Sequence, residues 1–222
     1  MRTSVLLFAV SAAASVTFLL ARPLTAGDWP VIFKVLSILL LAVLGIRVDG
    51  LLGGALALSS LGDFFLGVRR LGSLDRESLF LLGLGSFLIA HLIYIALFRK
   101  NRALVWWKPN AARVWGVLAI LVMLGSVLGI LQQSLGSMLI PVVVYSLALC
   151  CMGISAMLAD LGTPLASFGA LLFIASDALV AITKFRGPFP GKEQVIWITY
   201  YSAQFLILRG VERGHSRKQP TP

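Results

Sequence analysis

Apolar residues occupy this chain in long runs, and short polar stretches separate the runs. An α-helix needs about 20 predominantly apolar residues to cross the hydrocarbon core of a bilayer. Runs of suitable length cover residues 4–21, 30–46, 50–68, 78–98, 114–131, 137–159, 164–183 and 193–209. We therefore predict an all-α fold, a polytopic membrane helix bundle with about eight transmembrane helices.

The interruptions between the runs carry turn residues and charges, such as Arg22-Pro23 and Gly27-Asp28. Because the connections are short, neighbouring helices should pack in a compact bundle. We predict a single eight-helix transmembrane domain over residues 1–209, followed by a short basic cytoplasmic tail over residues 210–222. No separate soluble domain is expected.

The composition supports a membrane protein. Of the 222 residues, 59% are hydrophobic and 13% are charged, whereas a soluble domain is about half apolar and a quarter charged. Lipid must cover the surplus apolar surface. Cys150 and Cys151 are adjacent in one apolar run. Neighbouring residues on a helix point to different faces, so we expect no disulfide between them.

The net charge of +10 lies almost wholly in the loops and at the C-terminus. Lysine and arginine in such places orient membrane proteins and contact lipid headgroups, so we expect membrane lipids, and no nucleic acid, as partners. Arg2, the apolar run after it and the small residues near Ala26 also fit a signal peptide. A first transmembrane helix explains them equally well.

Eight crossings place both termini on one side of the membrane. That side carries 11 lysines and arginines, the other side carries 7, and Lys34 lies inside a span. The side with more lysine and arginine faces the cytoplasm. We expect both termini to be cytoplasmic in a bacterial inner (plasma) membrane.

A weak internal repeat relates the two halves. The motif that begins at Pro30 and contains Lys34 returns 111 residues later around Tyr145, and Gly62-Asp63 returns 114 residues later as Ser176-Asp177. Our hypothesis is a four-plus-four parallel repeat, in which an axis along the membrane normal relates the halves. In such a repeat Asp63 and Asp177 would face each other at one depth.

Two of the nine acidic residues, Asp63 and Asp177, lie well inside apolar spans. A carboxylate at that depth is costly, so it normally faces the interior of the bundle and has a function or a partner. The alternative is that the two aspartates only hold helices together, one of them bonded to Lys34.

Other polar side chains share this depth under the eight-span topology. We expect a cavity open to the outer face, lined by Asp63, Asp177, Lys34, Tyr145, Tyr200, Tyr201 and Gln204. Tyr200 and Gln204, four residues apart, share one helix face. His91 and Tyr94 lie deeper, toward the cytoplasmic end of their span.

Two facing carboxylates in a medium of low dielectric constant repel, so one of them should hold a proton at neutral pH. This arrangement provides a general acid together with a general base or charge stabiliser. The residues leave open which aspartate is the acid. Lys34 would be either a partner for a phosphate group or the counter-ion of the ionised aspartate.

Several other chemistries fit poorly. The chain has no HExxH, CxxC or GxSxG motif, and His91 is the one histidine inside a span. We therefore predict no metal site. Intramembrane aspartyl proteases also use two aspartates, but their Gly-x-Gly-Asp and Tyr-Asp patterns are replaced here by residues 60–63 and by Ser176-Asp177.

Four motifs together carry a resemblance to a known family. They are residues 61–66 (LGDFFL), 90–94 (AHLIY), 169–177 (GALLFIASD) and 200–204 (YYSAQ). In order and spacing they resemble the YhhN family of lysoplasmalogenase-like membrane proteins. The resemblance covers nearly the whole chain and includes the eight-span layout.

This resemblance implies an enzyme that hydrolyses the vinyl ether bond of lysoplasmalogens to a fatty aldehyde and a glycerophospho-alcohol. A lysophospholipid would be the substrate, with no cofactor. We expect Asp63 and Asp177 to be catalytic and Lys34, Tyr145, Tyr200, Tyr201, Gln204, His91 and Ser176 to bind substrate. The alternatives are a small proton-coupled transporter and a non-catalytic lipid-binding membrane protein.

Overall fold

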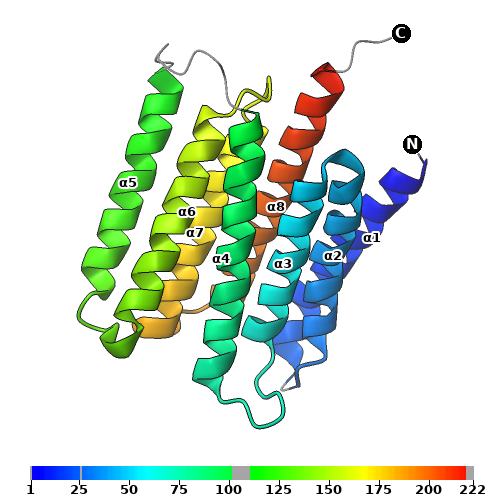
Figure 1. Cartoon of the computed structure of the whole chain (residues 1–222). Helices are drawn as coiled ribbons and strands as arrows, with labels where there is room; N and C mark the ends of the chain where they lie inside the picture. Colours follow the sequence, from blue (N-terminus) through cyan, green and yellow to red (C-terminus); the bar gives the residue numbers. More distant parts are fainter. Residues whose placement is uncertain (1, 26, 102–110, 219–222) are drawn as a thin grey trace. The chain divides into compact units, whose positions relative to one another are not determined.

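The computed structural model describes residues 2–25, 27–101 and 111–218, which form a helical membrane protein (Figure 1). The long helices in these ranges are α1 (Arg2–Ala21), α2 (Pro30–Val48), α3 (Gly50–Gly67), α4 (Arg76–Lys100), α5 (Ala111–Leu131), α6 (Leu139–Leu158), α7 (Leu165–Phe185) and α8 (Lys192–Lys218). Two 3-10 turns, η1 (Arg22–Leu24) and η2 (Gly136–Met138), precede α2 and α6. Arg102 and Lys108, which entered the charge balance, lie outside the described residues.

The eight predicted helices are confirmed. Seven of them, α1 to α7, are long and apolar enough to cross a membrane by length and composition. The eighth, α8, is less apolar because charged residues occupy its two ends, at Lys192, Glu193, Arg209, Glu212, Arg213, Arg217 and Lys218. Near its middle it also carries Tyr200, Tyr201 and Gln204, of which Tyr200 and Gln204 are buried.

The chain divides into two compact units, unit 1 (residues 1–94) and unit 2 (residues 95–222). Unit 1 contains α1, α2, α3 and most of α4, and unit 2 contains α5 to α8 with the end of α4. Within each unit, successive helices run in opposite directions (Figure 1). The division falls within α4, near the end of the fourth predicted span, and the four-plus-four repeat stays a prediction.

In unit 1, glycines bring α2 and α3 close together. A Cβ atom at Gly53 would lie 2.7 Å from the backbone nitrogen of Ile46 and 2.8 Å from its Cα. A Cβ atom at Gly45 would be similarly close to α3, at 3.1 Å from the backbone nitrogen of Gly53. Asp49 caps α3, since its Oδ1 accepts a hydrogen bond of 2.9 Å from the Leu51 N–H. These contacts fix the helix pair that carries Lys34 and Asp63.

In unit 2, α7 and α8 approach each other in the same way. A Cβ atom at Gly169 would lie 2.8 Å from the carbonyl oxygen of Ala203, and one at Gly210 would lie 2.6 Å from the backbone nitrogen of Ala166. Small residues allow such close approach of helix backbones in membranes. The pair α7 and α8 carries Asp177, Tyr200 and Gln204.

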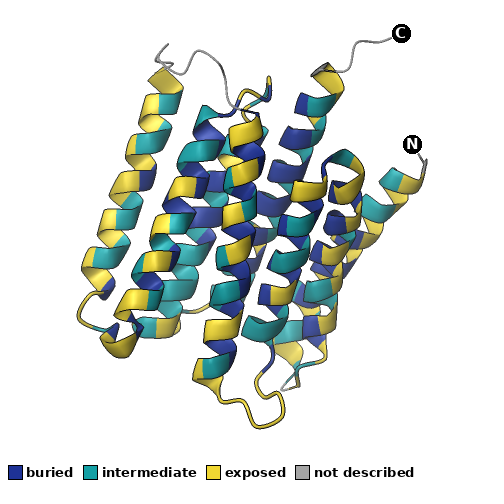
Figure 2. Cartoon of the chain, viewed as in Figure 1, coloured by how far each residue is buried: buried dark blue, intermediate teal, exposed yellow. Residues whose placement is uncertain are grey.

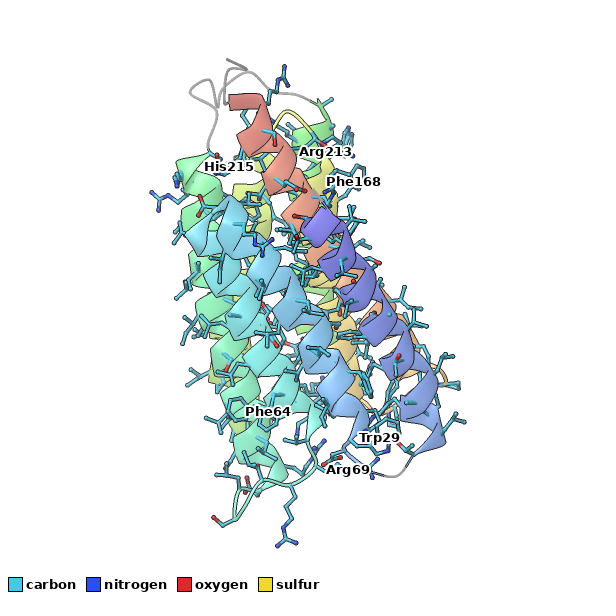
Figure 3. All side chains as sticks on the ribbon, turned by 90° about the vertical axis from the view of Figure 1, so that its right-hand side faces the viewer. Trp29, Phe64, Arg69, Phe168, Arg213 and His215 are labelled. Atoms are coloured by element: carbon cyan, nitrogen blue, oxygen red, sulfur yellow. The ribbon has the colours of Figure 1, made fainter. Side chains whose placement is uncertain are left out.

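The helix α8 does not end at residue 209 but continues to Lys218. Gly214 contacts Leu161, and Arg217 contacts Gly162, which has a φ of 64°. Arg213 and His215 lie at this end of α8 (Figure 3). The predicted boundary between the transmembrane domain and the basic tail therefore falls inside a helix that packs on the turn between α6 and α7.

Exposure differs between helices, and α5 has few buried residues (Figure 2). Its GxxxG motif would indicate a close helix contact. In the described part of the chain, however, a Cβ atom added at Gly125 or Gly129 would meet no atom within 4 Å. The motif therefore marks no contact between the described helices.

Ion pairs fix the end of unit 1 where α2 begins. Asp28 accepts a hydrogen bond of 2.7 Å from the Arg69 backbone N–H, and its other oxygen lies 3.5 Å from the Arg69 Nε. Arg22 reaches the same carboxylate at 4.0 Å. Trp29 packs edge-on against Phe33 and lies at the same end as Arg69 (Figure 3). The contacts hold the start of α2 one helical turn from Lys34.

The start of α4 is capped by Asp75. The Ser78 N–H donates a hydrogen bond of 2.7 Å to the Oδ1 of Asp75. Hydrogen bonds from Ser78 hold the pKa of this exposed carboxyl below its usual range. The capping interaction is therefore present at neutral pH and is lost as the pH falls through that lowered pKa.

Candidate functional site

Lys34 and Asp63 form an ion pair in unit 1. The Lys34 Nζ on α2 lies 2.9 Å from the Asp63 Oδ1 on α3. The Lys34 side chain is 17% exposed and the Asp63 side chain is 2% exposed. The structure thus places Lys34 as the counter-ion of Asp63, one of the two roles that the sequence had left open for it.

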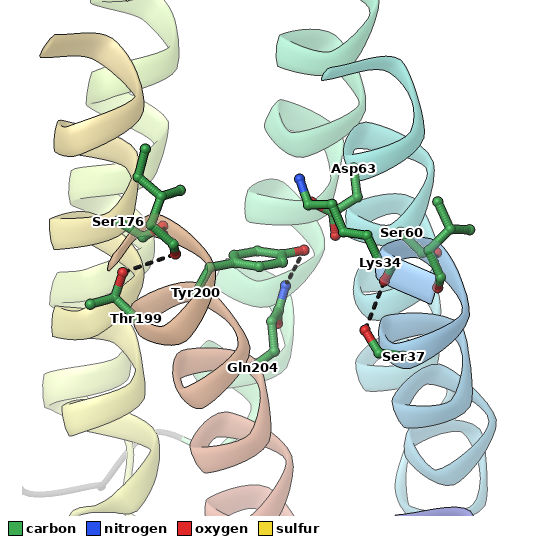
Figure 4. Close-up of polar contacts among 10 residues, drawn as sticks. Lys34, Ser37, Ser60, Asp63, Ser176, Thr199, Tyr200 and Gln204 are labelled. Carbon is green, nitrogen blue, oxygen red and sulfur yellow. Dashed lines mark hydrogen bonds and ion pairs between the residues drawn. The ribbon is translucent and has the colours of Figure 1, made fainter. Parts of the chain in front are cut away.

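Serine hydroxyls surround this ion pair (Figure 4). Ser60 donates a hydrogen bond of 2.9 Å to the Val35 carbonyl, and Ser37 donates one of 2.8 Å to the Lys34 carbonyl. Ser60 therefore ties α3 to α2 next to the ion pair. Sequence reasoning missed both serines as site neighbours, although each lies three residues from Lys34 or Asp63 and so shares a helix face with it.

Tyr145 and Asp177 form the corresponding contact in unit 2. The Tyr145 hydroxyl on α6 donates a short hydrogen bond to the Asp177 Oδ2 on α7. Tyr145 is 8% exposed and Asp177 is partly buried. Each intramembrane aspartate is therefore held by a side chain from the preceding helix.

The two contacts match the predicted repeat residue by residue. The repeat equates Lys34 with Tyr145 and Asp63 with Asp177. In each unit the structure joins the two residues that the repeat pairs, as Lys34 with Asp63 and Tyr145 with Asp177. The repeat therefore relates positions that share a structural role, although one partner is an ammonium group and the other a phenol.

Polar groups of α8 lie close to one another in unit 2. The Gln204 Nε2 donates a hydrogen bond of 3.3 Å to the Tyr200 hydroxyl, and both side chains are buried (Figure 4). Tyr200 also contacts Phe173 edge-on, with ring centroids 5.4 Å apart. The prediction that Tyr200 and Gln204 share a helix face is confirmed.

Ser176 and Tyr201 have other surroundings. The Ser176 hydroxyl donates a hydrogen bond of 3.1 Å to the Ile196 carbonyl, so it links α7 to α8. Tyr201 is partly buried, and its ring centroid lies 6.0 Å from that of Trp197. These contacts give both residues a packing role, and their predicted binding of substrate stays a prediction.

His91 and Tyr94 are fully buried on α4 in unit 1, each with 0% exposure. The predicted approach of Asp63 to Asp177 would join the two units, and it stays a prediction.

No group of three or more histidine, cysteine, aspartate or glutamate side chains in the described ranges could hold a metal ion. The polar groups described here can donate and accept protons, stabilise a cation and bind polar parts of a ligand.

Comparisons with known proteins identify relatives over most of the chain. The family model described as YhhN family matches residues 29–211. Lysoplasmalogenase of Mycobacterium tuberculosis (strain CDC 1551 / Oshkosh) is 36% identical over 159 residues, which cover 70% of this chain and 58% of that protein. Lysoplasmalogenase TMEM86B of Sus scrofa is 33% identical over 214 residues, which cover 92% of this chain and 85% of that protein.

The match to Lysoplasmalogenase TMEM86B of Homo sapiens is 34% identical over 160 residues, covering 71% of this chain and 61% of that protein. The chain thus spans less than two thirds of the length of the mycobacterial and human relatives. No solved structure matches this chain.

Proposed function

Since this chain belongs to the YhhN family, we propose that it is a membrane-embedded hydrolase that cleaves the vinyl ether bond of lysoplasmalogens. The observation that carries the proposal is the presence of two carboxylates inside apolar helices, each held by a defined partner. The names of relatives that are 33–36% identical to the chain support the choice of substrate.

The reaction needs one strong, positioned acid and one nearby anion. A carboxyl group transfers its proton to the vinyl carbon that is not bonded to oxygen, which leaves an oxocarbenium ion on the other carbon. Water adds to this ion and releases a proton to a carboxylate. The resulting hemiacetal collapses as its hydroxyl loses a proton and its carbon–oxygen bond to glycerol breaks. The glycerol oxygen takes up a proton, which gives a fatty aldehyde and a glycerophospho-alcohol.

The pair Asp63 and Asp177 would supply the acid and the anion, as two carboxylates do in glycoside hydrolysis. Each step moves protons between substrate, water and carboxyl groups, so it requires no redox partner. An oxocarbenium ion next to a carboxylate in a medium of low dielectric constant is stabilised far more than in water. The lipid tail of the substrate would remain among the apolar side chains.

The remaining polar residues would bind the headgroup and glycerol of the substrate. Lys34 would offer its ammonium group to the phosphate group, while it also neutralises Asp63. The other candidates are Tyr145, Tyr200, Tyr201, Gln204, His91 and Ser176. Lys34→Met should raise KM at least as much as it lowers kcat if the lysine binds the phosphate.

The purified protein in detergent, incubated with lysoplasmenylethanolamine or lysoplasmenylcholine, tests this function. We expect release of fatty aldehyde, and none from an acyl lysophospholipid, which lacks the vinyl ether. Asp63→Asn and Asp177→Asn should each lower kcat by about 10²–10⁴-fold. Asp160→Asn, an exposed acid in the turn between α6 and α7, is the matched control and should retain the wild-type rate.

Two alternative functions predict different results. A proton-coupled transporter would move its ligand into vesicles and release no aldehyde, because its aspartates would only carry protons. A lipid-binding protein would do neither. If both Asn variants hydrolyse lysoplasmalogen at the wild-type rate, the proposed carboxylate mechanism is wrong.

We also propose that the protein lies in a bacterial inner membrane with both termini in the cytoplasm. The proposal rests on the 11 lysines and arginines on the side of the termini, compared with 7 on the other side. The substrate would then reach Lys34 from the outer half of the membrane.

A further inference from the structure

The two intramembrane aspartates have chemically different partners. Asp63 lies 2.9 Å from the ammonium group of Lys34, and Asp177 accepts a hydrogen bond from the phenol of Tyr145. An ammonium group can only donate hydrogen bonds, whereas a phenol can both donate and accept. The partners therefore suit different protonation states of the two carboxyl groups.

We infer that Asp177 is the acid that protonates the vinyl ether, that Asp63 remains a carboxylate throughout the reaction, and that Tyr145 is the positioning residue of Asp177. This assignment of roles rests on the proposed function. It also resolves the choice of acid that the sequence left open.

Asp63 is buried next to a cation. Its side chain is 2% exposed, and the adjacent Lys34 is 17% exposed. If Asp63 gave a proton to the substrate, it would first have to hold that proton beside the positive charge of Lys34, which favours the ionised carboxylate. A fixed carboxylate instead stabilises the oxocarbenium ion as it forms.

Asp177, as the acid, must change its protonation state twice in each turnover. As the carboxyl acid it can donate a hydrogen bond to the Tyr145 oxygen, and as the carboxylate it can accept one from the Tyr145 hydroxyl. The phenol thus holds the carboxyl group in place in both states. The group gives its proton to the vinyl carbon and regains one from the water that adds to the oxocarbenium ion.

The effects of Asp63 and Asp177 on the pH dependence of activity must be distinguished from the effects of other titratable side chains. In the apolar helices of unit 1 the buried ones besides the ion pair are His91 and Tyr94 on α4. In unit 2 they are Cys150 on α6 and Tyr200 on α8, with the partly buried Tyr201. Histidine is the residue type among them that can act as an acid or base near neutral pH, so His91 is the group to control for.

The test is the pH dependence of kcat/KM on lysoplasmenylcholine, whose headgroup does not titrate in the range measured. Activity should fall at low pH when Asp63 takes up a proton and at high pH when Asp177 loses its proton. Tyr145→Phe should move only the high-pH limb, and Lys34→Met only the low-pH limb. Each variant should change that limb alone, because it removes a contact of one carboxyl group and leaves the contact of the other in place.

The residual activity of the Asn variants gives a second measurement that does not depend on Tyr145→Phe folding. Asp177→Asn lacks the proton donor, so hydronium must replace it and the residual rate should rise about tenfold for each unit by which the pH falls. Asp63→Asn retains the donor, so its residual rate should level off at low pH. Uncatalysed hydrolysis is subtracted from both.

Several outcomes would overturn the assignment. One is the reversed pattern, in which Tyr145→Phe moves the low-pH limb or Asp63→Asn depends on hydronium. Another is loss of the low-pH limb in His91→Gln, which would assign that limb to the histidine. Wild-type protein that releases no aldehyde at any pH would instead refute the proposed function itself, so the two failures are distinguishable.

Discussion

Lys34 and Asp63 place two opposite charges inside apolar helices, with side chains that are 17% and 2% exposed. Such a pair contributes little net stability, because desolvation of the charges offsets most of their attraction, yet removal of one partner is strongly destabilising. At the scale of single residues, the ion pair therefore affects the stability of the protein mainly when one of its two partners is removed.

Lys34→Met should destabilise the protein by about 3–5 kcal/mol, since it leaves Asp63 buried without its cation. Asp63→Asn should cost less, because Lys34 lies one turn from the start of α2 and can extend its ammonium group toward the interface. The double variant Lys34→Met/Asp63→Asn should be more stable than Lys34→Met. Thermal and denaturant unfolding in detergent measure the three differences.

The control for this set is Asp160→Asn, which changes an exposed acid and should leave the unfolding midpoint unchanged. If the double variant loses as much stability as the two single variants together, Lys34 and Asp63 do not interact energetically and the ion pair has no role in holding α2 to α3.

At the scale of helices, the contact between α2 and α3 depends on the absence of a side chain at Gly53. A Cβ atom there would meet the backbone of Ile46 at 2.7–2.8 Å, and backbone atoms can move away only if the helices separate. The separation would also change the distance between Lys34 and Asp63.

We expect Gly53→Ala to destabilise the protein by about 1–3 kcal/mol and to lower activity through the displaced ion pair. Gly54→Ala is the matched control, because a Cβ atom at Gly54 meets nothing within 4 Å. That change should be neutral or stabilising by up to about 1 kcal/mol, as alanine favours helix over glycine. If the two substitutions changed the free energy of unfolding equally, the close contact between α2 and α3 at Gly53 would not determine stability.

At the scale of the whole molecule, α8 decides the topology. Seven helices meet the length and composition of a membrane crossing, and α8 carries more polar residues. Its Trp197, Tyr200 and Gln204 are nevertheless buried, with exposures of 2%, 4% and 0%. We predict that α8 crosses the bilayer as well, because burial of these side chains would keep their polar groups away from lipid.

A crossing by α8 places the C-terminus on the same side as the N-terminus. Alkaline phosphatase fused after Pro222 should then be inactive in a bacterial host, and a fluorescent protein fused there should fluoresce. Phosphatase inserted in the turn between α5 and α6 should be active and serves as the control. An active phosphatase at the C-terminus would mean that α8 does not cross.

Features of the structure that depend on residue type and local order could be predicted from the sequence, whereas features that depend on packing between helices could not. The eight helices could be predicted because a bilayer demands long apolar segments whose backbone groups are all hydrogen-bonded internally, and their bounds in the structure differ mainly at the end of α8. The importance of Asp63 and Asp177 was equally visible, since a carboxylate is rare in such segments.

Contacts within the site were less predictable. The sequence offered Lys34 two roles. The serines at positions 37 and 60 share a helix face with Lys34 or Asp63, but their spacing alone does not say which carbonyl group each hydroxyl contacts. The sequence also did not show what the GxxxG motif of Gly125 and Gly129 contacts, since spacing alone does not say which neighbour a helix face meets.

The sequence by itself determined that the chain has eight long helices, that these are apolar, and that two acids lie within them, because each of these properties follows from residue type and local order. Only the tertiary structure decided that Asp63 contacts an ammonium group, that Asp177 contacts a phenol and that α8 hides its polar side chains. Those features depend on the rotation and separation of neighbouring helices, which distant glycines and side-chain packing set.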